Sequence, residues 1–277
     1  MISEKNNILI YYEGMRSYLI YENILNNESN LIDTVIEMPA LPYNRKNKKR
    51  NYSKIIKSAI ISPGYFFIQF LTIYVYKYLG KIFKNTIKDI CLKKNINYFY
   101  FEKIDSKFIN FVQSQKPTYI ISSTSSLLPE ELLNIPLLGT INFHEAPLPS
   151  YRGSAAYFWF RYNNEKTVWV TIHYVEKDLD SGEIICTGEK INIENNSSIF
   201  FIWRTMLISY KYIWEFITPY FYKSEKLRSQ KQNNQFAKTY SYPDKELNRN
   251  FKKRKIKILN IEDFIFFFRV IVFGKIY

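Results

Sequence analysis

The chain has 277 residues, of which 47% are hydrophobic and 18% aromatic, a composition that excludes a disordered protein. Its 39 Lys and Arg against 25 Asp and Glu give a formal net charge of +14, which raises nucleic acid or an anionic surface as a partner. Lys, Asn, Ile, Tyr and Phe are abundant along the whole chain, so we attribute much of this charge to general composition and predict no nucleic acid partner.

Cysteine usage and hydropathy indicate a compartment. Two cysteines are too few for a disulfide framework, and they lack metal-ligand spacing. The first residues lack the apolar run of a signal peptide, and no stretch reaches the ~18 to 20 apolar residues of a membrane span. We therefore expect a cytoplasmic protein without an integral membrane segment.

The N-terminal part reads as β-α units. Residues 8–12 and 32–38 are strand candidates, and residues 15–25 follow at helical spacing after a single glycine, so the glycine-rich fingerprint of dinucleotide-binding proteins is missing. The run Arg45 to Lys57 holds seven cations and no acid; a solvated loop is favoured over binding of a diphosphate or an anionic surface. The apolar helix predicted for residues 65–79 is expected to be buried, with a membrane interface as the alternative.

Strands and helices continue to alternate in the middle of the chain. This alternation predicts an α/β fold with a doubly wound, mostly parallel, Rossmann-like sheet. The predicted strands are residues 96–101, 119–123, 139–144, 168–175 and 184–193; the predicted helices are residues 106–115, 153–164 and 199–220, with a further helix start at Ser126, near the cap, and Pro129 in its first turn. Composition changes at Lys223, so we expect a catalytic domain over residues 1–222 and a small C-terminal subdomain over 223–277.

Polar residues at the end of one strand mark the candidate site. The period of two puts Asn142 and His144 on the same face of the strand 139–144, and Pro147 then ends the sheet, which places the pair at a carboxyl edge where ligands bind. If residues 168–175 form a neighbouring strand through a βαβ connection, Asp178 or Asp180 approaches His144. The pattern predicts a base, a carboxylate and an amide that could hold an oxyanion.

Two nearby residues have competing interpretations. His173 lies in the middle of its predicted strand, which favours a structural role. Arg152 belongs to a helix entry, but beside the site it could contact an anionic group of a substrate.

Several linked motifs resemble one family. The chain resembles the formyltransferases that use 10-formyltetrahydrofolate, and the resemblance covers residues 118–193 well. It is carried by Asn142-x-His144, Leu148-Pro149, Tyr151-Arg152-Gly153, Val170-Thr171-Ile172 and Leu179-Asp180-Ser181-Gly182. It implies a catalytic triad of Asn142, His144 and Asp180 without a metal. It also implies that the folate contacts Leu127, Leu128, Pro129, Asp178 and Leu179, and that the acceptor contacts Glu145, Tyr151 and Arg152.

Departures from the family pattern bear on the acceptor. Transfer-RNA formyltransferases typically continue after the histidine with x-Ser-Leu-Leu-Pro, whereas this chain has Glu145-Ala146-Pro147-Leu148-Pro149, and its tail looks short for their β-barrel. The resemblance then favours N-formylation of a nucleotide-linked amino sugar, the chemistry of O-antigen biosynthesis.

Several alternatives stay open. They are formylation of methionyl-tRNA or of glycinamide ribonucleotide, a formyltetrahydrofolate hydrolase, and a non-catalytic protein that binds RNA or a membrane surface. The sugar, its nucleotide, the position of its amine and a homodimer built on the tail are left open as well.

Overall fold

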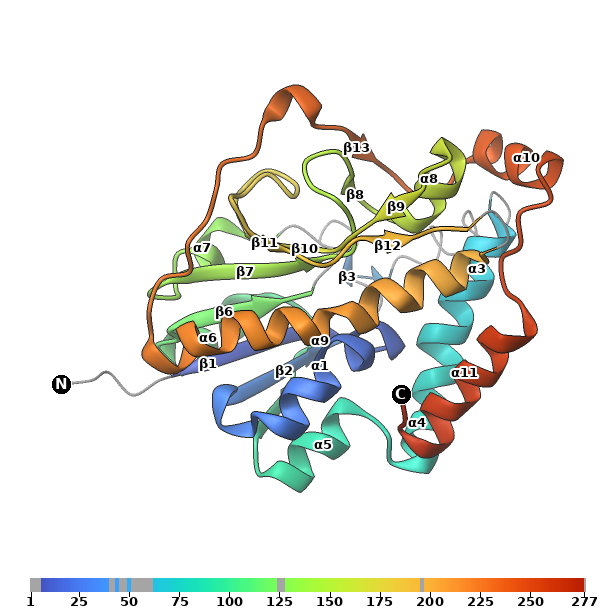
Figure 1. Cartoon of the computed structure of the whole chain (residues 1–277). Helices are drawn as coiled ribbons and strands as arrows, with labels where there is room; N and C mark the ends of the chain where they lie inside the picture. Colours follow the sequence, from blue (N-terminus) through green and yellow to red (C-terminus); the bar gives the residue numbers. More distant parts are fainter. Residues whose placement is uncertain are drawn as a thin grey trace.

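The computed structural model describes residues 6–39, 43–44, 49–50, 62–123, 128–194 and 197–276. Within them a seven-stranded sheet forms the centre of the molecule (Figure 1). Its order is β11 (Ile184–Thr187), β10 (Thr171–Tyr174), β7 (Gly139–His144), β6 (Tyr119–Ser122), β1 (Asn7–Tyr12), β2 (Thr34–Met38) and β5 (Asn97–Tyr100). The five neighbouring strands β7, β6, β1, β2 and β5 are parallel to one another, which confirms the predicted α/β class with a mostly parallel sheet.

One predicted connection was wrong. β7 and β10 are neighbours as expected, but they pair antiparallel, with Thr171 opposite His144 and Tyr174 opposite Ile141. The short helix α8 (Ala156–Asn163) does not carry the chain back along the sheet, so the chain enters β10 from the carboxyl end of β7. β11 then pairs antiparallel with β10.

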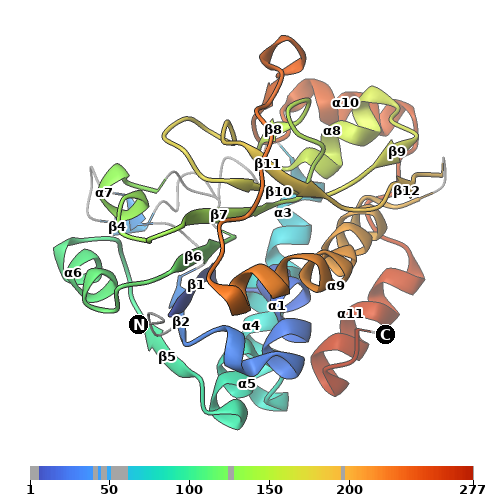
Figure 2. The same ribbon diagram turned by 60° about the vertical axis from the view of Figure 1, so that its left-hand side comes forward.

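The two faces of the sheet are covered by different helices (Figures 1 and 2). Alternate strand residues such as Leu9 and Ile121 pack with α1 (Met15–Asn27), α5 (Ile87–Lys94) and α9 (Ile199–Lys223). Their neighbours Ile8, Ile10 and Ile120 pack on the other face with α6 (Ser106–Ser114) and α7 (Glu130–Leu133). The strand period of two therefore decides which helix layer each side chain meets.

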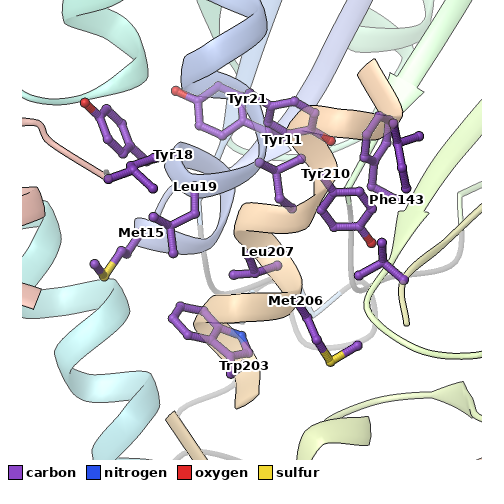
Figure 3. Close-up of a cluster of buried hydrophobic side chains, with 14 of the residues drawn as sticks. Tyr11, Met15, Tyr18, Leu19, Tyr21, Phe143, Trp203, Met206, Leu207 and Tyr210 are labelled. Atoms are coloured by element: carbon purple, nitrogen blue, oxygen red, sulfur yellow. The ribbon is translucent and has the colours of Figure 1, made fainter. Parts of the chain in front are cut away.

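Figure 3 shows the larger core beneath the site strand. Phe143 of β7 lies against Tyr210 and Trp214 of α9, with ring centroids 5.0 and 4.8 Å apart, and Trp214 Nε1 donates to the Ile20 carbonyl of α1 at 3.1 Å. Burying such an aromatic side chain stabilises the fold by roughly 1.5–3 kcal/mol. Because Phe143 is anchored on this face, its neighbours Asn142 and His144 must point to the opposite face.

Two predicted strands are interrupted. The predicted strand 168–175 consists of β9 (Thr167–Val168) and β10, and the predicted strand 184–193 consists of β11 and β12 (Ile191–Asn192). β9 pairs with β12 in a separate two-stranded sheet, which explains why both runs leave the main sheet. α7 also differs, because Pro129 is its N-cap rather than part of its first turn, and Ser126 lies outside the described residues.

The aromatic helix near residue 70 is buried on one side only. α3 (Pro63–Gln69), a π-helical segment (Phe70–Val75) and α4 (Tyr76–Phe83) follow one another without a break. Ile68 and Tyr76 are buried, but Phe70 is 43% and Tyr78 70% exposed, so the expected burial is found on one side of the segment and not on the other. Among the described residues no helix is both long and apolar enough to cross a membrane. The basic run from Arg45 lies outside the description, apart from the backbone of 49–50 in β4 (Lys49–Arg50), which pairs with β3 (Tyr43–Asn44).

The C-terminal part runs back over the sheet domain. β13 (Thr239–Tyr240) pairs parallel with β8 (Arg152–Gly153), α10 (Lys245–Lys253) packs against α8, and α11 (Ile261–Phe273) packs against α4 (Figure 1). Buried residues of α10 and α11 belong to the same core cluster as α9. The predicted division at residue 222 stays a prediction.

Candidate active site

The end of β7 holds the amide and the imidazole that the sequence indicated. Asn142 and His144 are 8% and 7% exposed, on the face opposite the anchored Phe143. Ser122 of β6 lies beside Asn142 in the register, and β10 covers the other side. Both side chains thus lie buried at the carboxyl end of β7, between β6 and β10.

His144 is held by the loop that follows its own strand. Its Nε2 lies 2.7 Å from the carbonyl oxygen of Tyr151, and because a carbonyl only accepts, Nε2 carries the proton and donates it. The lone pair of Nδ1 then faces Asp180, whose Oδ2 is 3.7 Å away. The Tyr151 carbonyl therefore orients the imidazole, while the carboxylate lies on the side where a further proton would bind.

Asp180 is brought in by the loop between β10 and β11. Its backbone has a φ of +49°, a left-handed conformation, and its Oδ2 accepts from the Gly153 amide at 2.8 Å. Gln232 Nε2 donates to the carbonyls of Asp180 and Gly182 at 2.8 and 2.7 Å, which fixes the loop from the C-terminal segment. Of the two carboxylates considered, Asp180 approaches His144, whereas Asp178 is exposed.

His173 belongs to the same group of side chains, which the sequence interpretation missed. It lies directly opposite Asn142 in the β7–β10 pair, so the two share a face. Its Nδ1 donates to the Tyr174 carbonyl at 2.7 Å, its Nε2 accepts from Asn142 Nδ2 at 3.2 Å, and Asp180 Oδ1 lies 3.7 Å from Nε2. Burial, followed by the charge of neighbouring His144, lowers the pKa of His173 to about 4. The antiparallel register of β7 and β10 could have identified His173, because it places His173 opposite Asn142. The assumption of a βαβ connection, which requires parallel strands, gives a different register.

A second missed residue is Arg16 of α1. Its guanidinium binds the carboxylate of Glu145 and donates to the carbonyl oxygens of Ser123 and Phe143, the latter at 3.2 Å. Arg16 thereby ties α1 to the ends of β6 and β7. Glu145, predicted to contact the acceptor, is engaged by this ion pair, and its side chain is 15% exposed.

The other predicted acceptor contacts lie beside β8. Tyr151 is buried, stacks on Tyr240 with ring centroids 4.9 Å apart, and hydrogen-bonds Glu165 through its hydroxyl. Arg152 donates to Gln232 Oε1 at 2.7 Å and to Asn234 Oδ1 at 2.8 Å. These partners are neutral amides, so they do not cancel the positive charge of Arg152.

The predicted folate contacts flank the site on two segments. Leu128 is buried in the core with Leu132, Pro129 is half-buried, and Leu179 is 41% exposed, whereas Leu127 lies outside the described residues. The two segments face each other, because Lys177 Nζ of the β10–β11 loop lies 3.9 Å from Glu130 Oε2 of α7. Their roles stay predictions.

The chain was compared with known proteins. Residues 81–199 match the model of the formyl transferase family. The bifunctional polymyxin resistance protein ArnA of Wigglesworthia glossinidia brevipalpis is 33% identical over 147 residues, which are 52% of this chain and 22% of that protein. A methionyl-tRNA formyltransferase of Clostridioides difficile is 35% identical over 118 residues, 42% of this chain and 38% of that enzyme. The matches thus span less than half the length of these two relatives.

The fold has counterparts among solved structures. An N-formyltransferase from Helicobacter canadensis, described in complex with folinic acid and dTDP-3-aminofucose, superposes with a TM-score of 0.55 at 16% identity, covering 85% of this chain and 70% of that one. The matched region 81–199 contains Asn142, His144, His173 and Asp180, so the whole cluster lies inside the family segment. Residues 81–199 of the chain are therefore similar to the formyl transferase family.

Proposed function

We propose that the protein transfers a formyl group from 10-formyltetrahydrofolate to the primary amine of a nucleotide-linked amino sugar. The observation that carries the transfer chemistry is the convergence of Asn142, His144 and Asp180 in one buried group at the carboxyl end of β7. A buried amide, imidazole and carboxylate are suited to an acyl transfer in which the acceptor attacks directly.

Asn142 supplies the oxyanion donor. One N–H of its amide is directed at His173 Nε2, which fixes the orientation of the side chain. The second N–H of the same nitrogen then serves the formyl oxygen as the amine adds to the formyl carbon and charge develops on that oxygen.

His144 and Asp180 handle the proton. The attacking amine loses a proton to His144 Nδ1, and the resulting imidazolium lies between the Tyr151 carbonyl and the Asp180 carboxylate. The bond from the formyl carbon to folate N10 then breaks, and N10 takes the proton back from His144. The reaction needs no metal, so a chelator should leave it intact.

The nucleotide-sugar acceptor is supported by the groups around β8. Arg152 brings a cation with neutral partners next to the cluster, and a diphosphate pairs well with a guanidinium. Tyr151, Tyr240 and Trp159 form an aromatic group there, with Trp159 and Tyr240 centroids 5.1 Å apart, and such rings stack on nucleobases. The Helicobacter canadensis structure, described with a dTDP-sugar, has the same fold.

Methionyl-tRNA is the second candidate acceptor. The observation that favours it is the identity of 35% to a methionyl-tRNA formyltransferase over part of the chain. The same cluster serves both acceptors, because the reacting group is a primary amine in each case.

The deciding experiment is an acceptor screen. The purified protein is incubated with 10-formyltetrahydrofolate and either a panel of amino-sugar nucleotides or charged initiator tRNA, and tetrahydrofolate release and the formylated product are measured. We expect turnover with at least one sugar nucleotide and none with the tRNA. Turnover with the tRNA and with none of the sugar nucleotides would show that tRNA is the acceptor. Release of formate without any acceptor would identify a hydrolase.

A further inference from the structure

The side chains of His144, His173 and Asp180, here called the imidazole–carboxylate cluster, have a property that formyl transfer does not require. Each imidazole donates one N–H to a backbone carbonyl, His144 to Tyr151 and His173 to Tyr174, both at 2.7 Å. The other nitrogen of each imidazole lies 3.7 Å from an Asp180 oxygen, and that of His173 also accepts from Asn142 Nδ2 at 3.2 Å. Two unprotonated ring nitrogens and a carboxylate thus lie together as three possible metal ligands.

This arrangement approaches the geometry of a transition-metal site, and the ligand atoms would have to move closer together to bind an ion. The three ligand atoms lie within 4.8 Å of one another. Zinc bonds of about 2.0–2.2 Å put neighbouring atoms of a tetrahedron roughly 3.3 Å apart, so each imidazole is about half an ångström too far from the carboxylate. Metal-binding histidines also usually give their other N–H to a carbonyl or carboxylate, as both do here.

We propose that the imidazole–carboxylate cluster binds Zn²⁺ or a similar borderline transition metal, and that the bound metal inhibits the enzyme. The ligands are His144 Nδ1, His173 Nε2 and an Asp180 oxygen, and the fourth position is open. Inhibition rests on the proposed function, because the metal occupies the lone pair of His144 that accepts the amine proton. It also releases Asn142 Nδ2 from His173 Nε2, which frees the oxyanion donor from its fixed orientation.

The chain makes a direct binding test unambiguous. It contains only two histidines, and both belong to the cluster. With any affinity tag removed, Zn²⁺ binding is measured by calorimetry, Co²⁺ binding by its visible absorption, and the two histidine side chains are followed by NMR. We expect one ion per chain, a Co²⁺ spectrum typical of four ligands, and shifts of both imidazole signals. Mg²⁺ should not compete, because it prefers oxygen ligands in an octahedron.

Variants assign the ligands. His173→Gln should weaken Zn²⁺ binding by at least tenfold. Cys186→Ser is the matched control, because Cys186 lies opposite Ile172 on β10, which puts its side chain on the other face of the sheet from His173. If the control weakens binding and His173→Gln does not, or if neither imidazole signal moves in the unaltered protein, the cluster is not the site. The NMR test needs no variant, so a misfolded variant cannot hide the answer.

Activity is tested separately. Zn²⁺ should stop formyl transfer in the unaltered protein, and EDTA should restore it. Since binding is measured without a formyl donor, an inactive protein that binds Zn²⁺ through both imidazoles would refute the proposed function and not the metal site. An active protein that binds no Zn²⁺ would refute the metal site alone.

Discussion

At the scale of single residues, the proposed chemistry depends on Asn142, His144 and Asp180 acting together. Changing each to alanine should lower turnover, and the loss of an oxyanion donor typically costs about 10² to 10³ in rate. The effects should not add, because the residues serve one transition state. Turnover of the single and double variants, with folding checked by circular dichroism, measures this.

A matched control is Asn192→Ala, which removes the same amide from an exposed strand position outside the site. It should leave turnover unchanged. A His144→Ala enzyme with near-normal turnover would contradict the mechanism. The other imidazole near Asp180 is that of His173, and it could replace His144 as the base only by giving up its hydrogen bond from Asn142.

The sequence predicted part of this group for a definite reason. Strand alternation is local, so Asn142 and His144 could be placed on one face from five consecutive residues. His173 and Arg16 reach the same place through the pairing of β10 with β7 and the packing of α1 on the strand ends. His173 and Asn142 are separated by 31 positions in the sequence, and Arg16 and Phe143 by 127. The periodicity of a single sequence describes neighbouring residues, so it does not predict contacts over such distances.

At the scale of elements, the contact between β8 and β13 connects the C-terminal segment to the site. Gly153 has a φ of +98°, and a Cβ there would lie 2.1 Å from the Tyr240 carbonyl oxygen. Its amide also holds Asp180 Oδ2. Only glycine permits this approach of the two backbones.

We therefore expect Gly153→Ala to lower the free energy of unfolding by about 2 kcal/mol, from strain and overpacking, and to lower turnover as well. Urea unfolding and steady-state kinetics measure the two effects. Gly80→Ala in α4 is the control, because its Cβ would make only ordinary contacts, the nearest at 3.4 Å, and alanine favours a helix. Equal stability of the two variants would mean that β8 and β13 do not need this close contact.

Helices with a sustained apolar period were predicted correctly, whereas strands were predicted wrongly where their extent depends on which other strand they pair with. The helices at residues 15–25, 106–115 and 199–220 are confirmed in α1, α6 and α9. The runs 168–175 and 184–193 were read as single strands, but β9 and β12 leave the main sheet to pair with each other. Propensity identifies an extended segment, but it does not identify the partner.

At the scale of the whole molecule, one half-buried carboxyl, that of Glu37, makes stability depend on pH. Burial raises the pKa of Glu37, although its hydrogen bond from the Tyr11 hydroxyl opposes the shift. A pKa that is higher in the folded than in the unfolded state means that stability is lost as pH rises through the folded value. Glu37→Gln should then gain stability relative to the unaltered protein on going from about pH 4 to about pH 7. Urea unfolding at both pH values measures it, and an unchanged difference would contradict it.

The net charge of +14 allows the two candidate acceptors, RNA and a nucleotide sugar, to be distinguished by the salt dependence of acceptor binding. An RNA acceptor would be bound through many of its phosphates. If the protein neutralises six or more of them, the affinity for the RNA should fall by roughly 10³-fold or more between about 50 and 200 mM salt. A nucleotide sugar offers two phosphates to a few cations. We expect a shallow salt dependence of the acceptor KM.

The basic stretch at the C-terminal end of α10 provides the matching variant. Lys252, Lys253 and Lys255 are exposed, whereas Arg254 donates to the carbonyls of Arg161 and Tyr162 at 2.8 and 3.1 Å and so helps hold α10 on α8. Changing the three lysines to Gln and leaving Arg254 in place removes three charges without disturbing that contact. The triple variant should keep its KM for a sugar nucleotide. Formylation of charged initiator tRNA that is steeply salt-sensitive and lost in the triple variant would overturn the sugar acceptor, while the chemistry assigned to Asn142, His144 and Asp180 would stand.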